Sequence, residues 1–240
     1  MTAPAQIPLD LGHRPALGRE DFLVAPGNEV AVAWIDRWPD WPSRALAIFG
    51  SPGSGKTHLC QVWRRASGAI EVDVAMLRRD EPPAYLGEAE GGTLACVVED
   101  VGDHLAAEPE VARRLLHLYN MMLERRGFLL LSDRNPPVRW PCPLADLRSR
   151  LAAMQAVALG EPDDDLMKRV LKKHFDDRQL IADKGVLDYL ATRMERSFAA
   201  ARKVVTAMDH AALVERRNIS VALARAVLQK LDTEEAEDKS

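Results

Sequence analysis

The stretch GSPGSGKT, residues 50–57, fits the pattern G-x-x-x-x-G-K-(S/T). It follows a short apolar run at residues 45–49, which predicts a buried strand, and it precedes a helical pattern that begins at about Lys56. A strand, a glycine-rich turn and a helix in this order are typical of a phosphate-binding loop. The stretch therefore predicts an α/β fold of the P-loop type.

The residue types in this loop predict how a nucleotide is held. Gly50, Gly53 and Gly55 allow backbone N–H groups to wrap around phosphates. We expect Lys56 to reach the outer phosphates and Thr57 to ligate Mg²⁺ at the start of the helix. The flanking strand and helix make a chance glycine turn a much poorer interpretation.

The rest of the first 160 residues alternates strand and helix patterns. An amphipathic helix is predicted over about 109–126, since Val111, Leu115 and Met122 recur at helical spacing. Alternating strands and helices indicate a parallel sheet covered on both faces. With residues 45–49, the predicted strands are 69–73, 94–98, 128–132 and 155–158.

The sequence divides into four parts. A proline- and glycine-rich leader, residues 1–19, precedes the α/β part at 20–160. Residues 161–231 show helical periods only, at the start of this part and over about 183–194, 197–216 and 220–231, so we expect a separate all-helical domain. Residues 232–240 are interpreted as an acidic, solvated tail.

Two carboxylates end the strand predicted at 94–98. Glu99 and Asp100 stand where a P-loop protein has an aspartate that helps to hold Mg²⁺. Together they could bind the metal and orient a water molecule. The alternative is a strand end that carries solvated charge.

Two further polar positions are candidates for catalysis. Asp133 ends the strand at 128–132, beside the strand with the two carboxylates, and could sense the γ-phosphate, although polar residues commonly follow buried strands. Arg150, in the short helix predicted around 146–151, could stabilise charge in the phosphoryl transfer of a neighbouring subunit. An exposed arginine is more often a solvated surface charge.

Composition limits the remaining function classes. The chain has 240 residues, 47% of them hydrophobic, and a net charge of −4, which argues against nucleic-acid binding through bulk charge. Cys60, Cys96 and Cys142 are widely spaced, which favours a reducing compartment. We found no secretory signal and no membrane-spanning stretch, so we expect a cytoplasmic protein without a membrane partner. Trp34, Trp38 and Trp41 are expected to pack an N-terminal helix onto the sheet.

Taken together, these pieces resemble the AAA+ family and, more narrowly, the DnaA/Hda family of bacterial replication proteins. The resemblance runs from about residue 20 to 231. It implies an α/β nucleotide-binding domain with a five-stranded parallel sheet, followed by a helical lid, with ADP or ATP and Mg²⁺ between them. The stretches that carry it are EDFLVAPGNEVA (20–31), GSPGSGKTHL (50–59), VVEDV (97–101), LHLYNMMLERRG (116–127), LLLSDRNPP (129–137) and LRSRL (147–151).

The resemblance also implies roles for individual residues. Asp133 matches the first sensor, Arg150 matches the arginine finger, and Asp100 completes the catalytic set with them. The sequence departs from the family at Glu99, where aspartate is usual, and at Ala199, which stands where the second sensor arginine is expected. The nucleotide-binding set implied is Phe22, Leu23, Val24, Asn28, Gly50, Gly53, Ser54, Gly55, Lys56, Thr57 and His58, with Thr57 and Glu99 as metal ligands.

The absence of the second sensor arginine favours a protein that rests with ADP and hydrolyses ATP poorly. Arg196 or Arg202 lies within a turn of Ala199 and is a weak candidate to replace it. The chain ends soon after its last predicted helix, so we expect no domain for sequence-specific DNA binding. These features favour the short, Hda-like branch of the family, whose partner is DnaA. The family also implies self-association.

The leader contains QIPLDLG, residues 6–12, which is similar to peptides that dock on the DNA polymerase sliding clamp. Gln6 would hydrogen-bond at the rim of a pocket on the clamp β subunit, while Ile7, Leu9 and Leu11 bury apolar area. Our hypothesis is an Hda-like regulator that stimulates ATP hydrolysis by DnaA and so restrains replication initiation. The alternatives are a self-sufficient AAA+ ATPase, such as a helicase loader or nucleic-acid remodeller, and a nucleotide-bound scaffold without a catalytic contribution.

Overall fold

The computed structural model describes residues 22–86, 93–215 and 218–237. The predicted clamp-binding residues Gln6, Ile7, Leu9 and Leu11 lie outside these ranges. Five strands form one sheet in the order β2-β3-β4-β1-β5, and every neighbouring pair is parallel. The expected five-stranded parallel sheet is therefore confirmed. The strands are β1 (Ala45–Phe49), β2 (Ile70–Val72), β3 (Ala95–Glu99), β4 (Phe128–Asp133) and β5 (Gln155–Ala158).

Strand register decides which polar residues share the carboxyl edge of the sheet. Phe49 at the end of β1 pairs with Asp133 of β4. Glu99 of β3 pairs with Ser132, which is also in β4. The phosphate-binding stretch begins at Gly50, directly after β1. The loop, Glu99 and Asp133 consequently lie side by side on three adjacent strands.

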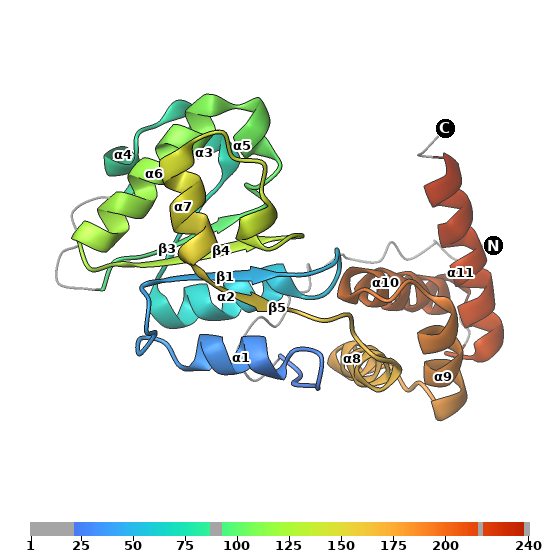
Figure 1. Cartoon of the computed structure of the whole chain (residues 1–240). Helices are drawn as coiled ribbons and strands as arrows, with labels where there is room; N and C mark the ends of the chain where they lie inside the picture. The colour runs from blue at the N-terminus through green and yellow to red at the C-terminus, as the bar shows by residue number, and fades with distance from the viewer. Residues whose placement is uncertain (1–21, 87–92, 216–217, 238–240) are drawn as a thin grey trace.

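Helices cover both faces of the sheet (Figure 1). One hydrophobic core contains α1 and α2 with one face of the strands, and the other contains α3, α6 and α7 with the opposite face. Parallel strands buried on both faces need continuous apolar runs, which these strands have. The helices are α1 (Glu29–Asp36), α2 (Lys56–Ser67), α3 (Val74–Arg79), α4 (Pro82–Leu86), α5 (His104–Ala107), α6 (Pro109–Glu124) and α7 (Ala145–Ala153), with a 3₁₀ helix η2 (Pro137–Arg139).

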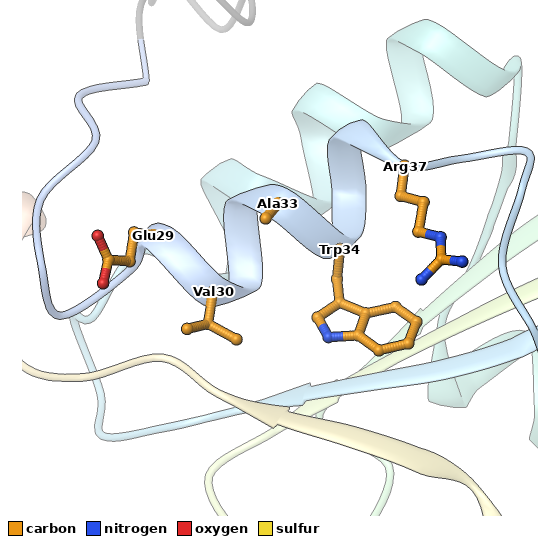
Figure 2. A pocket seen from close by; sticks show the side chains of 5 residues that line it. All are labelled: Glu29, Val30, Ala33, Trp34 and Arg37. Atoms are coloured by element: carbon orange, nitrogen blue, oxygen red, sulfur yellow. The ribbon is translucent and has the colours of Figure 1, made fainter.

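An aromatic cluster joins α1 and α2 to the sheet. The Trp41 ring stacks on Trp63 at 5.4 Å between centroids, and Trp38 meets Trp63 edge-on at 6.4 Å. Both Trp38 and Trp41 also contact Phe128 of β4. Trp34 of α1 is half-buried and packs against the same core, as expected. It also lines a shallow pocket, and the Arg37 guanidinium lies 5.7 Å from its ring centroid (Figure 2).

The chain after β5 is helical over the described residues. It comprises α8 (Asp164–Asp177), α9 (Lys184–Arg193), α10 (Phe198–Glu215) and α11 (Val221–Glu237), which we call the helical unit. All the buried residues of its hydrophobic core lie between Met167 and Val227, so this unit has a core of its own. The helix predicted over 220–231 continues to Glu237, so much of the predicted tail at 232–240 is helical. Glutamate and alanine are good helix formers, and Lys230 pairs with Glu234 one turn later.

The helical unit is joined to the sheet through the loop before α1. The N–H of Gly160, which follows β5, donates a 2.8 Å hydrogen bond to the carbonyl of Gly27. The two backbones are so close that a Cβ on Gly160 would lie 2.9 Å from that carbonyl oxygen. Arg169 of α8 donates to the carbonyl of Val24 at 3.2 Å. Among the described helices, none is long and apolar enough to cross a membrane.

Candidate phosphate-binding site

The loop between β1 and α2 has the geometry of an anion cradle. Gly53 and Gly55 have φ angles of 76° and 99°, which residues with a side chain rarely adopt. Gly55 directly precedes the first turn of α2, whose N-terminal N–H groups are therefore presented at the end of the loop. The glycine positions predicted from the sequence are the ones that this backbone path requires.

Lys56 closes the loop from within. Its buried ammonium donates to the carbonyls of Gly50 and Ser51, each at 2.9 Å. Burial lowers the pKa of Lys56, and the nearby carboxylates of Asp100 and Asp133 act in the opposite direction. An ammonium has three N–H donors, so one remains for a further acceptor at the mouth of the loop.

Ser54 supplies a second polar group in the loop. Its hydroxyl oxygen is buried and has no hydrogen-bond partner within the described part of the chain. A buried hydroxyl without a partner is unfavourable, which suits a site where an oxygen ligand completes the arrangement. The loop, Lys56 and Ser54 together therefore fit a phosphate group.

Glu99 and Thr57 are in direct contact. The Thr57 hydroxyl donates a 2.8 Å hydrogen bond to Glu99 Oε2, and the Ser132 hydroxyl lies 3.3 Å from the same oxygen. Burial raises the pKa of Glu99, while the hydrogen bonds from Thr57 and Ser132 oppose this shift. Hydroxyl and carboxylate oxygens are the ligands that Mg²⁺ prefers, so the donor set fits this metal. Sequence reasoning had not placed Ser132 in this contact.

Asp100 and Asp133 have different surroundings. Asp100 is exposed, has a φ of 53°, and its N–H donates to the Ser132 carbonyl at 2.8 Å. Asp133 is buried, and its two carboxylate oxygens accept the N–H groups of Gly102 at 2.7 Å and Arg134 at 2.6 Å. Asp133 therefore fixes the loop after β3 against the end of β4, close to Lys56.

The start of α10 packs directly on the loop, a contact that the sequence did not predict. The N–H of Phe198 lies 3.3 Å from the Gly53 carbonyl, which accepts its hydrogen bond. A Cβ on Gly53 would be 2.1 Å from the Cβ of Ser197, and one on Gly55 would be 2.6 Å from the Phe198 ring. Ser197 also caps α10, because its hydroxyl accepts the N–H of Ala200 at 3.0 Å. This cap marks the start of the helix in the sequence, but it does not indicate the contact with the loop.

The N-terminal loop reaches the same place. The Phe22 ring packs edge-on against His58, 5.1 Å between centroids, and lies next to Gly55. The buried Asn28 side chain accepts the N–H of Ala25 at 2.9 Å and donates to the Leu23 carbonyl at 3.0 Å. Its amide therefore closes the loop itself, while Leu23 is half-buried and Val24 is exposed.

The region of the missing second sensor arginine is occupied differently from our weak expectation. Ala199 is exposed in the first turn of α10. Arg196 pairs with Asp164 of α8 at 2.7 Å, and Arg202 lines a groove together with Ala199 and residues of α11. No hydrogen bond joins either arginine to the phosphate-binding loop in the described ranges.

Arg150 lies near the end of α7. Its guanidinium is 5.5 Å from the Tyr119 ring centroid and 3.8 Å from Asp146, and its Nε is buried without a partner among the described residues. These contacts are with α6 and α7, and none of them is with the phosphate-binding loop of the same chain. Arg148, on the same helix, is held by the Cys142 carbonyl at 3.1 Å.

Comparisons with known proteins identify relatives of this chain. No family model matches it. The replication initiator protein DnaA of Thermus thermophilus is 26% identical over 95% of this chain and 55% of its own length. DnaA of Lactobacillus delbrueckii is 22% identical over 88% of this chain and 50% of its own length. The chain is thus related in sequence to DnaA and spans about half the length of the curated relatives that it matches.

Solved structures share its fold. Domain III of DnaA from Thermotoga maritima superposes with a TM-score of 0.75 at 17% identity, covering 90% of this chain and 97% of that one. DnaA from Aquifex aeolicus bound to AMPPCP gives a TM-score of 0.68 at 18% identity, covering 93% of this chain and 71% of that one. The chain has the fold of DnaA domain III, which confirms the α/β architecture expected from the AAA+ resemblance.

Proposed function

We propose that this chain is an Hda-like regulator of replication initiation that binds ADP or ATP and stimulates ATP hydrolysis by DnaA. The observation that carries the proposal is the placement of Arg150. Its guanidinium lies over the Tyr119 ring of α6 and 3.8 Å from Asp146, and its buried Nε has no partner among the described residues. An arginine held in this way suits insertion into the nucleotide site of a neighbouring subunit.

Nucleotide binding is supported by the loop geometry and by the nucleotide-bound relative of the same fold. We assign the phosphates to the loop N–H groups, Lys56 and Ser54. The base and ribose are assigned to the space between the N-terminal loop with Phe22 and the start of α10 with Phe198. In this proposal the helical unit is the lid of the site, and 20–160 and 161–231 are separate domains.

Thr57 and Glu99 are the proposed ligands of Mg²⁺. When bound, Mg²⁺ would neutralise negative charge on the phosphate oxygens. The 2.8 Å hydrogen bond between them uses only the Thr57 proton, so lone pairs on the Thr57 oxygen and on the Glu99 carboxylate remain for the metal. Ser132 still contacts Glu99 Oε2 and would keep the carboxylate oriented.

Weak hydrolysis by the chain itself is part of the proposal. Neither arginine near Ala199 is hydrogen-bonded to the loop in the part of the chain described, since Arg196 pairs with Asp164 and Arg202 lines a groove with residues of α11. Without a cation from the helical unit, charge that develops at the γ-phosphate lacks one stabilising group. Asp100 and Asp133 remain the proposed water-orienting and sensing residues.

We propose that the leader, residues 1–19, determines where the protein acts. Gln6, Ile7, Leu9 and Leu11 are proposed to dock on the β sliding clamp, which would concentrate Arg150 near DnaA on newly replicated DNA. Replacement of Gln6, Leu9 and Leu11 by alanine should abolish clamp binding and leave ADP binding unchanged. This result would separate the docking proposal from the nucleotide proposal.

The central experiment measures phosphate release from ATP-bound DnaA in the presence of DNA-loaded clamp. We expect Arg150→Ala to reduce the stimulation at least about a hundred-fold, within the range known for arginine fingers. Arg148→Ala, on the same helix, should retain it. Unchanged stimulation by Arg150→Ala, with normal clamp binding, would overturn the proposed mechanism.

A self-sufficient AAA+ ATPase is the second candidate, because the relatives found are named as the initiator DnaA itself. It predicts multiple turnovers by the purified chain alone, abolished by Lys56→Ala. Mass spectrometry of the nucleotide released on denaturation distinguishes the two. Co-purified ADP with negligible turnover favours the regulator, and rapid turnover favours the ATPase.

A further inference from the structure

A groove of about 720 Å³ lies between α10 and α11 in the helical unit. No residue of the phosphate-binding loop lines it, and Ala199 is the one lining residue that belongs to the first turn of α10, next to Phe198. The residues that line it are Arg178, Ala199, Arg202, Lys203, Thr206, Ala207, His210, Ala211, Val227, Lys230, Leu231 and Glu234.

The floor of this groove is apolar and leaves room for a side chain. Ala207 and Ala211 line it from α10, and both are too small to fill the space between the helices. Val227 and Leu231 face them from α11. An aliphatic side chain of a partner would bury its surface here, which favours binding by roughly 25 cal/mol per Å² of apolar area covered.

The rim of the groove is positively charged. Arg178, Arg202, Lys203 and Lys230 line it, against the single carboxylate of Glu234. Arg202 is exposed, and it has no ion pair within the described residues. By contrast, Arg178 is held in place by the Thr206 hydroxyl at 2.9 Å and lies 3.9 Å from Asp209, and Lys230 pairs with Glu234 at 3.7 Å. This positive patch stands out in a chain whose net charge is −4.

The same cations act on a neighbouring histidine. The pKa of His174 in α8 is lowered to about 4, first by burial and then by Arg178, with Arg202 and Lys173 acting in the same direction and Asp177 opposing them. Two of the cations that shift this pKa are the same ones that line the groove. The positive charge at the groove therefore also acts on His174 in α8.

These features select an occupant. Nucleic acid that binds without sequence preference uses aromatic side chains for base stacking, and no Phe, Tyr or Trp is among the described residues that line the groove. A cationic rim around an apolar floor is complementary to carboxylates that flank an aliphatic side chain. We propose that the α10–α11 groove binds an acidic peptide segment of a partner protein, with an aliphatic residue on its floor.

The test uses the full chain and a fluorescein-labelled twelve-residue peptide of alternating glutamate and leucine pairs. Its counterpart with glutamine in place of glutamate is the neutral probe. By fluorescence anisotropy at low salt, we expect the acidic peptide to bind at least about ten-fold more tightly than the neutral one. Binding should weaken steeply as salt is added, since the rim is exposed.

Two groove variants address the charge and the floor separately. Arg202→Glu should weaken binding of the acidic peptide at least about ten-fold. Ala207→Leu fills the floor, keeps every charge and should weaken binding as well. Arg65→Glu, an exposed position on α2, is the matched charge control and should bind normally. Circular dichroism and binding of a fluorescent ADP analogue check that each variant is folded.

Three results would overturn the proposal. The first is equal binding of the acidic peptide by the original chain and Arg202→Glu. The second is tighter binding of a twenty-residue oligo(dT), sensitive to Arg202→Glu, which would make the groove a nucleic-acid site. The third is self-association in sedimentation velocity that Arg202→Glu abolishes, which would make the occupant a second copy. None of these results depends on Arg150 or Lys56.

Discussion

The backbone N–H of Phe198 in α10 is hydrogen-bonded to the carbonyl of Gly53 in the phosphate-binding loop, at 3.3 Å. This bond joins two residues that are far apart in the sequence. It makes the backbone path of the loop dependent on the position of the helical unit. The apposition is so tight that Gly53 has no room for a side chain.

Gly53→Ala should therefore destabilise the protein by at least about 2 kcal/mol, because strain at positive φ is added to a clash with Ser197. Gly68→Ala is the matched control. Gly68 has a similar φ of 70°, but an added Cβ would meet no atom within 4 Å, so it should cost only about 1 kcal/mol. Urea denaturation measures both. Equal losses would show that the contact with Ser197 adds nothing.

The aromatic cluster gives a second pair of variants. Trp63 is fully buried against Trp38 and Trp41, so Trp63→Ala should cost about 3–5 kcal/mol. Trp34 is only half-buried against the same core and lines the pocket of Figure 2, so Trp34→Ala should cost less, about 1–2 kcal/mol. Thermal unfolding compares the two variants. Equal losses from Trp34→Ala and Trp63→Ala would contradict this ranking.

Glu99 is predicted to couple metal binding to the nucleotide. Glu99→Gln removes the charge that attracts Mg²⁺, so the gain in ATP affinity on adding Mg²⁺ should fall about ten-fold or more. Glu99→Asp keeps the carboxylate and should preserve most of that gain. Titration of a fluorescent ATP analogue with and without Mg²⁺ provides the comparison. An unchanged response to Mg²⁺ in Glu99→Gln would remove Glu99 from the metal site.

The same residue predicts a dependence of stability on pH. Because the pKa of Glu99 is raised by burial, its charged form opposes folding, and this penalty grows as the pH rises from below 4.5 through the raised pKa. Glu99→Gln should then be more stable than the original chain at pH 7, with the advantage shrinking at pH 4. Unfolding by urea at the two pH values is the measurement. An equal difference in stability between the two proteins at pH 7 and pH 4 would contradict the raised pKa of Glu99.

His174 shifts stability in the other direction. Its pKa is about 4 in the folded chain and near 6.5 when unfolded, so the unfolded state binds the proton first as the pH falls. Stability should decrease between pH 6.5 and 4, and His174→Gln should flatten this decrease. The midpoint of the His174 ring signals in an NMR titration checks the cause. A midpoint near 6.5 would be the opposing result.

Local sequence patterns were sufficient to predict the sheet and the phosphate-binding loop. The strand before GSPGSGKT and the helix after it were predicted correctly, because an apolar run and a glycine turn determine the local geometry. The adjacency of Glu99 to the loop also followed, since parallel strands bring their carboxyl ends to one edge. These inferences need only residues close in sequence or in neighbouring strands.

Contacts between distant segments could not be predicted in this way. Nothing near Ser197 and Phe198 in the sequence indicates that they pack on Gly53 and Gly55, because that contact depends on how the helical unit is placed. Asn28 was assigned to the nucleotide-binding set from the resemblance alone, and its amide closes its own loop, so its role toward a nucleotide stays a prediction. The acidic run after Leu231 was interpreted as a solvated tail, although the same residues extend α11 to Glu237.

The back-to-back contact of Gly27 and Gly160 has a consequence for how this sequence can diverge. A Cβ on Gly160 would lie 2.9 Å from the Gly27 carbonyl oxygen, and one on Gly27 would lie 3.2 Å from the Glu161 carbonyl oxygen. A larger residue at either position separates the two backbones, whatever the other residue is. In descendants of this gene, the two positions should therefore be under joint purifying selection, and drift at one should be tolerated only with a change in the length of the connection after β5.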